Sequence, residues 1–232
     1  MRRLLLVLLV LPLAACSSTE NQAARLLTPT ASVQKAATKT AAATSVHVAL
    51  NASGSKGMLS GSVSGSGDFD NANHRGSFHL DVSGYGSIDA VVDGINAYVK
   101  APFLATFLPA GKTWMKLNAR RSTFKVVPQN PQQALARLKK LAHVRVVGDE
   151  TIDGVDTTHY QGTGRRGRGT LDVWIGKNDG YVRRIEAAAS GDAVNGNLTV
   201  SFSDFGEPVT VTVPPASETA DATNLLPFFH RG

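Results

Sequence analysis

The sequence predicts a mainly β domain of the α+β class, built on one antiparallel sheet of about ten or eleven strands with two helices. Apolar and polar residues alternate with a period of two over most of the chain, which predicts strands with one apolar and one polar face. Short Gly-, Asp- and Asn-rich turn sequences separate these runs, and no βαβ rhythm is present. A sheet of this size must curl or split, so helices could cover its concave apolar face.

Residues 1–15 are predicted to be an export signal. Two arginines precede the unbroken apolar run Leu4 to Leu13, which is too short for a membrane span of about 20 residues. The sequence Leu13-Ala14-Ala15-Cys16 resembles a bacterial lipobox, in which the cysteine receives a diacylglycerol and becomes the new N-terminus. We therefore predict a lipid anchor at Cys16 in the cell membrane, with the mature chain on the extracytoplasmic face.

Cys16 is the only cysteine of the chain, so an intramolecular disulfide is excluded. The alternative for Cys16 is an incidental cysteine near the cleavage site of a secreted protein. Residues 16–30 are predicted to form the lipidated N-terminus and a flexible tether, whose coil would reach on the order of 20 Å. The domain is predicted over residues 31–226, followed by a C-terminal tail at residues 227–232.

The first helix is predicted from Ala31 to Thr44, because apolar residues recur at helical spacing while Lys35 and Lys39 lie on another face. Ser32 is its expected cap. A second helix is predicted within Pro128 to Leu141, where Asn130 before a proline fits a cap. The clearest strand patterns lie at Val46–Leu50, Phe78–Val82, Leu171–Ile175, Leu198–Phe202 and Val209–Val213.

Charge and motifs argue against several classes of function. The formal net charge is +6, or +4 without the two arginines of the signal, and this balance does not indicate a nucleic-acid-binding protein. None of the six histidines belongs to a zinc-binding pattern, and His159 is expected to pack beside Tyr160. Gly61–Gly65 matches a serine nucleophile elbow only loosely. We therefore expect that the protein is not an enzyme and that it binds neither a metal nor a cofactor.

Several motifs together resemble the LppX/LprAFG lipoproteins of actinobacteria, which are related to the lipoprotein carriers LolA and LolB. The resemblance extends from about Ala37 to Leu226. It implies an incomplete antiparallel β-barrel around a hydrophobic cavity with two or three helices as a lid, and it implies binding of acylated lipids or glycolipids. The motifs that carry it are Gly65-Ser66-Gly67-Asp68-Phe69-Asp70, Asn73-His74-Arg75-Gly76, Val91-Val92-Asp93-Gly94, Tyr98-Val99-Lys100, Pro102-Phe103-Leu104, Leu108-Pro109-Ala110-Gly111-Lys112, Trp114-Met115-Lys116-Leu117, Gly154-Val155-Asp156-Thr157-Thr158-His159-Tyr160, Val173-Trp174-Ile175 and Val182-Arg183-Arg184.

Strand alternation alone assigns the residues of the expected cavity, and a register error of one residue would turn them outward. The predicted lining is Val48, Leu50, Phe78, Leu80, Val92, Leu171, Val173 and Phe202. The predicted rim or lid is Phe103, Leu104, Phe107, Leu108, Leu135 and Leu138. Arg165, Arg166 and Arg168 are candidates for contact with anionic headgroups, although a solvated hairpin tip would have the same composition.

The sequence therefore favours a non-enzymatic lipoprotein that shields acyl chains of a lipid or glycolipid from water, with a membrane transporter as a further candidate partner. The alternative is an envelope interaction or sensory protein that has a filled core and binds a membrane protein without lipid. A hydrolase is a distant third.

Overall fold

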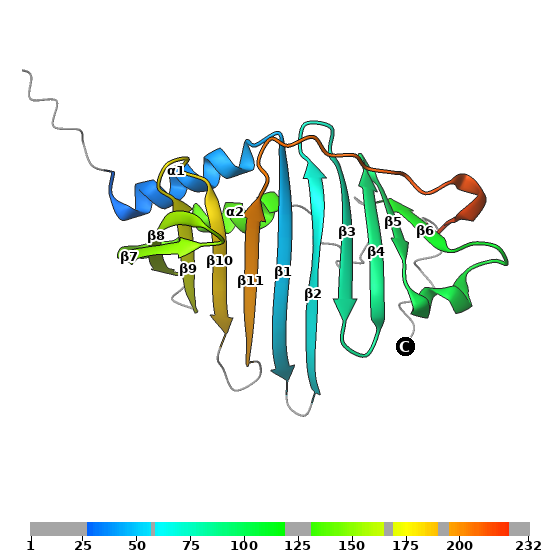
Figure 1. Ribbon diagram of the computed structural model, residues 1–232. Coiled ribbons are helices and arrows are strands. Elements are labelled where there is room, and N and C mark those ends of the chain that lie inside the picture. The colour runs from blue at the N-terminus through cyan, green and yellow to red at the C-terminus, as the bar shows by residue number, and fades with distance from the viewer. Residues whose placement is uncertain (1–26, 57–58, 119–130, 165–168, 190–194, 223–232) are drawn as a thin grey trace, which may run out of the picture.

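The computed structural model describes residues 27–56, 59–118, 131–164, 169–189 and 195–222. They form one twelve-stranded sheet, two α-helices and two short 3-10 helices (Figure 1). The strands are β1 (Ser45–Lys56), β2 (Leu59–Asp70), β3 (Arg75–Val82), β4 (Gly86–Asp93), β5 (Asn96–Lys100), β6 (Trp114–Asn118), β7 (Ala142–Ile152), β8 (Val155–Thr163), β9 (Thr170–Gly176), β10 (Val182–Ala189), β11 (Asn195–Ser203) and β12 (Thr219–Asp221). The helices are α1 (Pro29–Ala41), α2 (Pro131–Leu138), η1 (Pro102–Phe107) and η3 (Ala216–Glu218).

The strand order is β12-β6-β5-β4-β3-β2-β1-β11-β10-β9-β8-β7. Neighbouring strands are antiparallel except for β12, which runs parallel to β6. The two halves of the sheet are therefore meanders, joined where β1 pairs with β11. The edge strands β7 and β12 do not meet, so the sheet is open.

The structure has more strands than the ten or eleven expected, and one predicted strand is wrong. Residues 209–213 belong to no strand, although the valines there are half-buried and Thr210 and Thr212 are exposed. Prolines at 208, 214 and 215 remove backbone donors on both sides of this run, which disfavours pairing in a sheet. The segment instead crosses the sheet in extended form on its way from β11 to the far edge (Figure 1).

Helix α1 begins earlier than the sequence pattern suggests. Its N-cap is Thr28, whose hydroxyl oxygen accepts a hydrogen bond from the Ala31 amide at 3.2 Å. Pro29 occupies the first turn, where its missing N–H costs nothing. The predicted cap at Ser32 is therefore wrong, and the last two residues of the expected tether, 29–30, belong to the helix.

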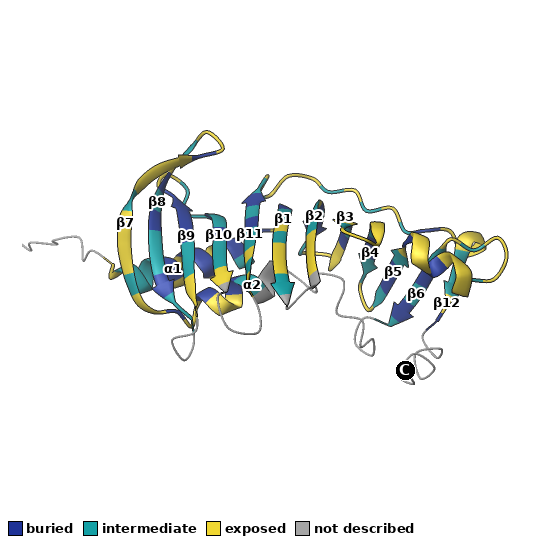
Figure 2. Cartoon of the chain, turned by 90° about the horizontal axis from the view of Figure 1, so that it is seen from below, coloured by how far each residue is buried: buried dark blue, intermediate teal, exposed yellow. Residues whose placement is uncertain are grey.

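Both α-helices lie on one side of the sheet, under the half that contains β7–β11 (Figure 2). Helix α1 packs against β7, β9 and β10 as well as against α2. Helix α2 is shorter than predicted, and its expected cap Asn130 lies outside the described residues. The segment after β11 runs along the other side of the sheet, so the two faces have different coverings.

Thr40 connects α1 to the sheet. Its side chain is 1% exposed, and its hydroxyl donates to the Ala36 carbonyl at 2.9 Å. The same oxygen accepts a hydrogen bond from the backbone N–H of Val182 at 2.9 Å. Val182 pairs with Ile175 of β9 next to a register shift, and the pairing between β10 and β11 begins only at Arg184. The helix therefore satisfies a buried donor of the sheet.

Candidate apolar binding face

The register of the sheet joins apolar residues of different strands into rows on the side that carries the helices. One row runs from Phe202 through Val48, Gly67, Phe78, Ala90 and Val99 to Met115. The next runs from Tyr160 through Val173, Ile185, Val200, Leu50, Gly65 and Leu80 to Ile88. Since side chains in paired positions lie on the same face, these rows form one apolar surface across both halves of the sheet.

All eight residues predicted to line the cavity lie on this face. Val48, Phe78, Leu80, Val173 and Phe202 are buried, whereas Leu50, Val92 and Leu171 are half-buried. Their common face follows from the period of two that the sequence displays. Sequence reasoning missed the β5 and β6 members of the surface, Ala97, Val99, Met115 and Leu117, although these also alternate with polar neighbours.

Glycines interrupt the face along β2. A Cβ atom at Gly67 would overlap the Ser77 carbonyl oxygen and the Phe78 ring, and a Cβ atom at Gly65 would overlap the backbone of His79 and Leu80. Only glycine therefore permits the close approach of β3 at these two positions. Phe78 occupies the space beside Gly67, so the centre of the face is bounded by side chains from β1 and β3.

The helical leucines predicted at the cavity rim lie instead in the core. Leu135 is 2% and Leu138 is 1% exposed, and both belong to the main hydrophobic cluster. Their spacing of three residues places them on one stripe of α2, and this stripe packs inward beside α1. They help to close the β7–β11 half of the face rather than border an opening.

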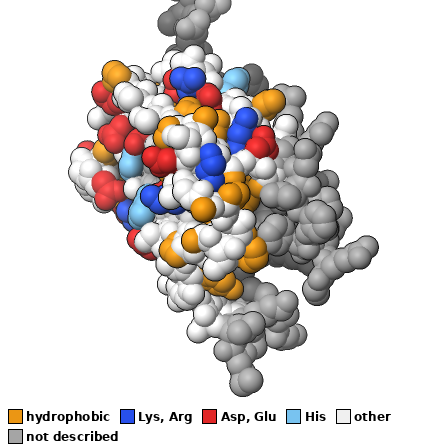
Figure 3. Space-filling view, turned by 90° about the vertical axis from the view of Figure 1, so that its right-hand side faces the viewer, with side chains coloured by type: hydrophobic (Ala, Val, Ile, Leu, Met, Phe, Trp, Pro, Cys, Tyr) orange, Lys and Arg blue, Asp and Glu red, His pale blue; other side chains and the backbone are white. Residues whose placement is uncertain are grey.

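The other predicted rim residues lie in η1 or directly after it, in the connection between β5 and β6, and they differ in burial. Leu104 is buried and Leu108 is half-buried against the core cluster. Phe103 is 36% and Phe107 is 59% exposed. Hydrophobic side chains gather on this end of the molecule in the space-filling view (Figure 3). The helix η1 thus joins the apolar face to an exposed aromatic surface.

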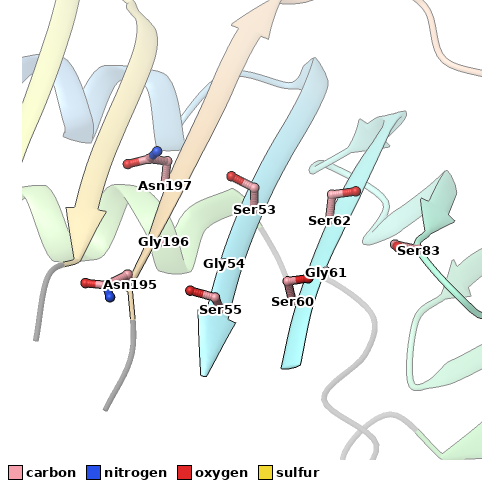
Figure 4. Close-up of a pocket in the computed structure, with 10 residues that line it drawn as sticks. All are labelled: Ser53, Gly54, Ser55, Ser60, Gly61, Ser62, Ser83, Asn195, Gly196 and Asn197. Carbon is pink, nitrogen blue, oxygen red and sulfur yellow. The ribbon is translucent and has the colours of Figure 1, made fainter. Parts of the chain in front are cut away.

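Two pockets formed by described residues are polar. One, of about 510 Å³, lies at the ends of β1, β2 and β11 and is lined by serine, glycine and asparagine (Figure 4). Its lining has no carboxylate, imidazole or ammonium group to transfer a proton. The other, of about 270 Å³, lies between the outer face of the sheet and the segment after β11, and its lining includes His47, Asp68, Asp204 and Glu207.

The outer face carries a hydrogen-bonded cluster around His159. Its Nδ1 lies 2.9 Å from Glu150 Oε1, and its Nε2 lies 2.8 Å from Asp172 Oδ1. The ring stacks on Trp174 with a centroid distance of 4.2 Å, and Trp174 Nε1 donates to Glu150 Oε2 at 3.1 Å. His159 therefore packs against Trp174 and not beside Tyr160, which lies on the opposite face. With both ring nitrogens engaged, the cluster is suited to hold β7, β8 and β9 together.

Two other histidines of the outer face are paired with aspartates. His47 Nδ1 lies 2.7 Å from Asp68 Oδ1, and His79 Nδ1 lies 2.6 Å from Asp89 Oδ1. The hydrogen bond with Asp89 raises the pKa of His79 above its ordinary value. Within the described ranges, no group of three or more His, Cys, Asp or Glu side chains could hold a metal ion.

Cys16 and the cations Arg165, Arg166 and Arg168 lie outside the described residues. The expected tail, residues 227–232, also lies outside them. None of the helices in the described segments has the length and hydropathy needed to cross a membrane.

Comparison with known sequences decides the family. The profile of the LppX_LprAFG lipoprotein family matches residues 28–211, which include α1 and eleven of the twelve strands. The chain belongs to the LppX/LprAFG lipoprotein family. The resemblance noted in the sequence is thereby confirmed.

Two Streptomyces relatives match part of this LppX/LprAFG lipoprotein. A protein of Streptomyces coelicolor designated lipoprotein SCO4650 is 38% identical over 99 residues, 41% of this chain and 34% of the relative. An uncharacterized 31.2 kDa protein of Streptomyces griseus is 30% identical over 125 residues, 41% of this chain and 40% of the relative. The matches therefore span less than half the length of these curated relatives.

Two solved structures share the fold of this LppX/LprAFG lipoprotein. LprF from Mycobacterium bovis has a TM-score of 0.60 and 17% identity, covering 81% of this chain and 97% of LprF. The lipoprotein LppX from Mycobacterium tuberculosis has a TM-score of 0.54 and 21% identity, covering 79% of this chain and 98% of LppX. The predicted fold class, a mainly β and incomplete antiparallel barrel, is confirmed.

Proposed function

We propose that this lipoprotein is a non-enzymatic lipid-binding protein that holds the acyl chains of a lipid or glycolipid against the apolar face of its sheet. Cys16 anchors it to the extracytoplasmic side of the cell membrane. The lipid is bound because its acyl chains are removed from water, and each buried methylene contributes about 0.8 kcal/mol to the free energy of binding. A membrane transporter that supplies or accepts the lipid is a candidate partner.

One observation carries the proposal: among the described residues, the apolar face extends beyond the strands that α1 and α2 cover. The rows of apolar side chains continue from β11 across β1 to β6, whereas α1 and α2 lie under the β7–β11 half (Figure 2). An apolar sheet face on this scale has to be covered, and an acyl chain is one candidate cover. An acyl chain has the chemistry and the linear shape to lie along rows such as Val48, Phe78 and Val99.

The burial of the same half favours a second candidate. Phe78, Leu80 and Ile88 are each less than 5% exposed, as in a filled core. A protein with this core would act through its outer surface, as an envelope interaction or sensory lipoprotein without lipid cargo. For the carrier, the same burial means that the face has to open before an acyl chain enters.

Native mass spectrometry of the purified full chain tests the carrier proposal by counting lipid bound in addition to the covalent anchor. We expect co-purified lipid on the wild type and less on Leu50→Ser, because Leu50 is a half-buried member of the face. The matched control is Asn51→Ser, at the next position of β1 and on the other face of the sheet, which should retain lipid. Repeated absence of any bound or exchangeable lipid from the wild type would overturn the carrier proposal and favour the interaction protein.

A further inference from the structure

In the half of the sheet that contains β2–β6, the connections at the two ends differ in charge. At the end where β2 and β4 finish, each strand ends at an aspartate, namely Asp70 and Asp93. At the opposite end, where β3 and β5 finish, residues 83–85 and 101–113 connect the strands. These connections contain no Asp or Glu and one charged residue, Lys112.

Aromatic side chains are exposed at these two connections. Tyr85, in the turn between β3 and β4, is 64% exposed, and Phe103 and Phe107 of η1 are 36% and 59% exposed. The rings of Tyr85 and Phe103 meet edge to face with centroids 6.1 Å apart, so the turn and η1 form one surface. We name Tyr85, Phe103 and Phe107 the aromatic tip.

The aromatic tip is fixed to the domain. Leu104, between two tip residues in sequence, is 5% exposed within the core cluster. The Lys112 ammonium donates to the carbonyls of Ala216 and Ser217 at 3.0 and 2.9 Å, which ties the same connection to η3. The exposure of Tyr85 and Phe103 is therefore a property of the folded domain, and it leaves aromatic surface in water at a cost that a membrane can remove.

A bilayer fits this surface better than a protein. Tyrosine favours the headgroup level of a membrane, and phenylalanine is typical of segments that lie in the interface. A protein interface normally surrounds its aromatic anchors with a polar, hydrogen-bonding rim. Residues 83–85 and 101–113 themselves contain no carboxylate that anionic headgroups would repel, and the Glu218 carboxylate beside them accepts a hydrogen bond from Thr113 Oγ1 at 3.3 Å. The nearest acidic residue toward β3, Asp81, accepts a hydrogen bond from Ser87 at 2.6 Å on the outer face.

We propose that the aromatic tip inserts into the headgroup region of the membrane to which the lipoprotein is anchored. Insertion would place η1 at the bilayer, and Leu104 and Leu108 of this connection continue into the core cluster of the apolar face. The tip would thus lie where an acyl chain passes between bilayer and protein. The inference rests on the proposed function only in that the chain resides at a membrane, because insertion requires no cargo.

Site-specific fluorescence on the full, acylated chain in vesicles of phosphatidylethanolamine and phosphatidylglycerol tests the insertion. The chain has no other cysteine than Cys16, so Ala105→Cys, at an exposed position of η1, can carry an environment-sensitive label. Asn178→Cys, exposed in the β9–β10 turn at the other end of the sheet, is the matched control. We expect a blue shift and at least about twofold stronger quenching by headgroup-level spin-labelled lipid at position 105, since interfacial segments sink about 5–10 Å.

Tyr85→Ser combined with Phe103→Ser, introduced into the Ala105→Cys chain, should reduce this quenching to the level seen at position 178. Equal signals at positions 105 and 178 on vesicle-bound protein would overturn the insertion. A shift at position 105 that depends on protein concentration without vesicles would overturn it in favour of a second copy as the occupant. Flotation of the position-178 chain reports separately whether the anchor holds the protein on vesicles, and lipid counting by mass spectrometry reports on cargo.

Discussion

His79 and Asp89 form an exposed pair that makes the stability of the fold depend on pH. Its hydrogen bond with Asp89 at 2.6 Å is the main cause of its raised pKa, and Asp81, 3.8 Å from Nε2, contributes less. A raised folded pKa means that protonated His79 stabilises the fold below pH 6.5, its ordinary pKa, and that this stabilisation is lost as the pH rises through the folded value. The pair is about half exposed, so the contribution is at most about 1 kcal/mol.

Asp89→Asn should therefore lower the pKa of His79, whereas Asp81→Asn should lower it less. Titration of the His79 ring protons by NMR measures both values. The free energy of urea unfolding should fall between pH 6 and pH 8 more in the wild type than in Asp89→Asn. Equal effects of the two substitutions on the pKa would contradict the assignment to the Asp89 hydrogen bond.

Residue-level prediction from sequence succeeded where it used periodicity and failed where partners come from other strands. Alternation placed Val48, Phe78 and Val173 on one face, because the period of two is a property of each strand by itself. The surroundings of His159 depend on Glu150 and Trp174 in neighbouring strands, and pairing between strands cannot be read from one of them. Alternation does show that His159 and Tyr160 lie on opposite faces, so the expected contact between them was excluded by the same rule.

At the scale of elements, the connection between α1 and β10 depends on one hydroxyl group. Thr40→Val keeps the shape of the side chain but removes the acceptor for the buried Val182 N–H. We expect a loss of about 1–3 kcal/mol in the free energy of unfolding, because a buried donor is left without a partner. Urea unfolding followed by circular dichroism measures this loss.

Thr38→Val is the matched control. Thr38 lies in the same helix and donates to the Gln34 carbonyl, but it is exposed and accepts no bond from the sheet. Its replacement should cost much less than that of Thr40. Similar losses for the two variants would mean that helix propensity, and not the bond to β10, accounts for the effect.

The element boundaries that the sequence missed have local physical causes. Thr28 and Pro29 are a cap and first-turn pair that precedes the apolar stripe on which the prediction of α1 relied. The residues at 209–213 do alternate between half-buried and exposed. Alternation indicates that one side of a segment is covered, but it does not show whether the backbone pairs with a neighbouring strand. The prolines beside it were the signal that could have excluded a strand.

At the scale of the whole molecule, the open sheet, the proposed anchor at Cys16 and the aromatic tip together determine how the domain can contact a membrane. The twelve strands form a broad apolar face, and in the described part of the chain the two α-helices lie under one half of it. The family resemblance predicted this open sheet, whereas composition alone could not, because closure depends on whether β7 and β12 meet. Helix α1 begins thirteen residues after Cys16 in sequence, so an anchored domain stays within a few tens of ångströms of the bilayer. The proposed anchor at Cys16 would therefore limit which surfaces of the domain can meet lipid.

Replacing the anchor is the decisive test at this scale. Cys16→Ala should abolish incorporation of radiolabelled palmitate and remove the mass of the acyl chains, because no other cysteine can accept them. The Cys16→Ala chain should also shift from the membrane fraction toward the soluble fraction, since membrane binding by the tip alone would bury too little apolar surface to hold the protein. Ser17→Ala, one position further along, is the matched control and should remain labelled and membrane-bound. Unchanged labelling and mass in Cys16→Ala would show that the chain is not acylated there, and attachment to the membrane would then have to come from the uncleaved apolar run or from the domain itself.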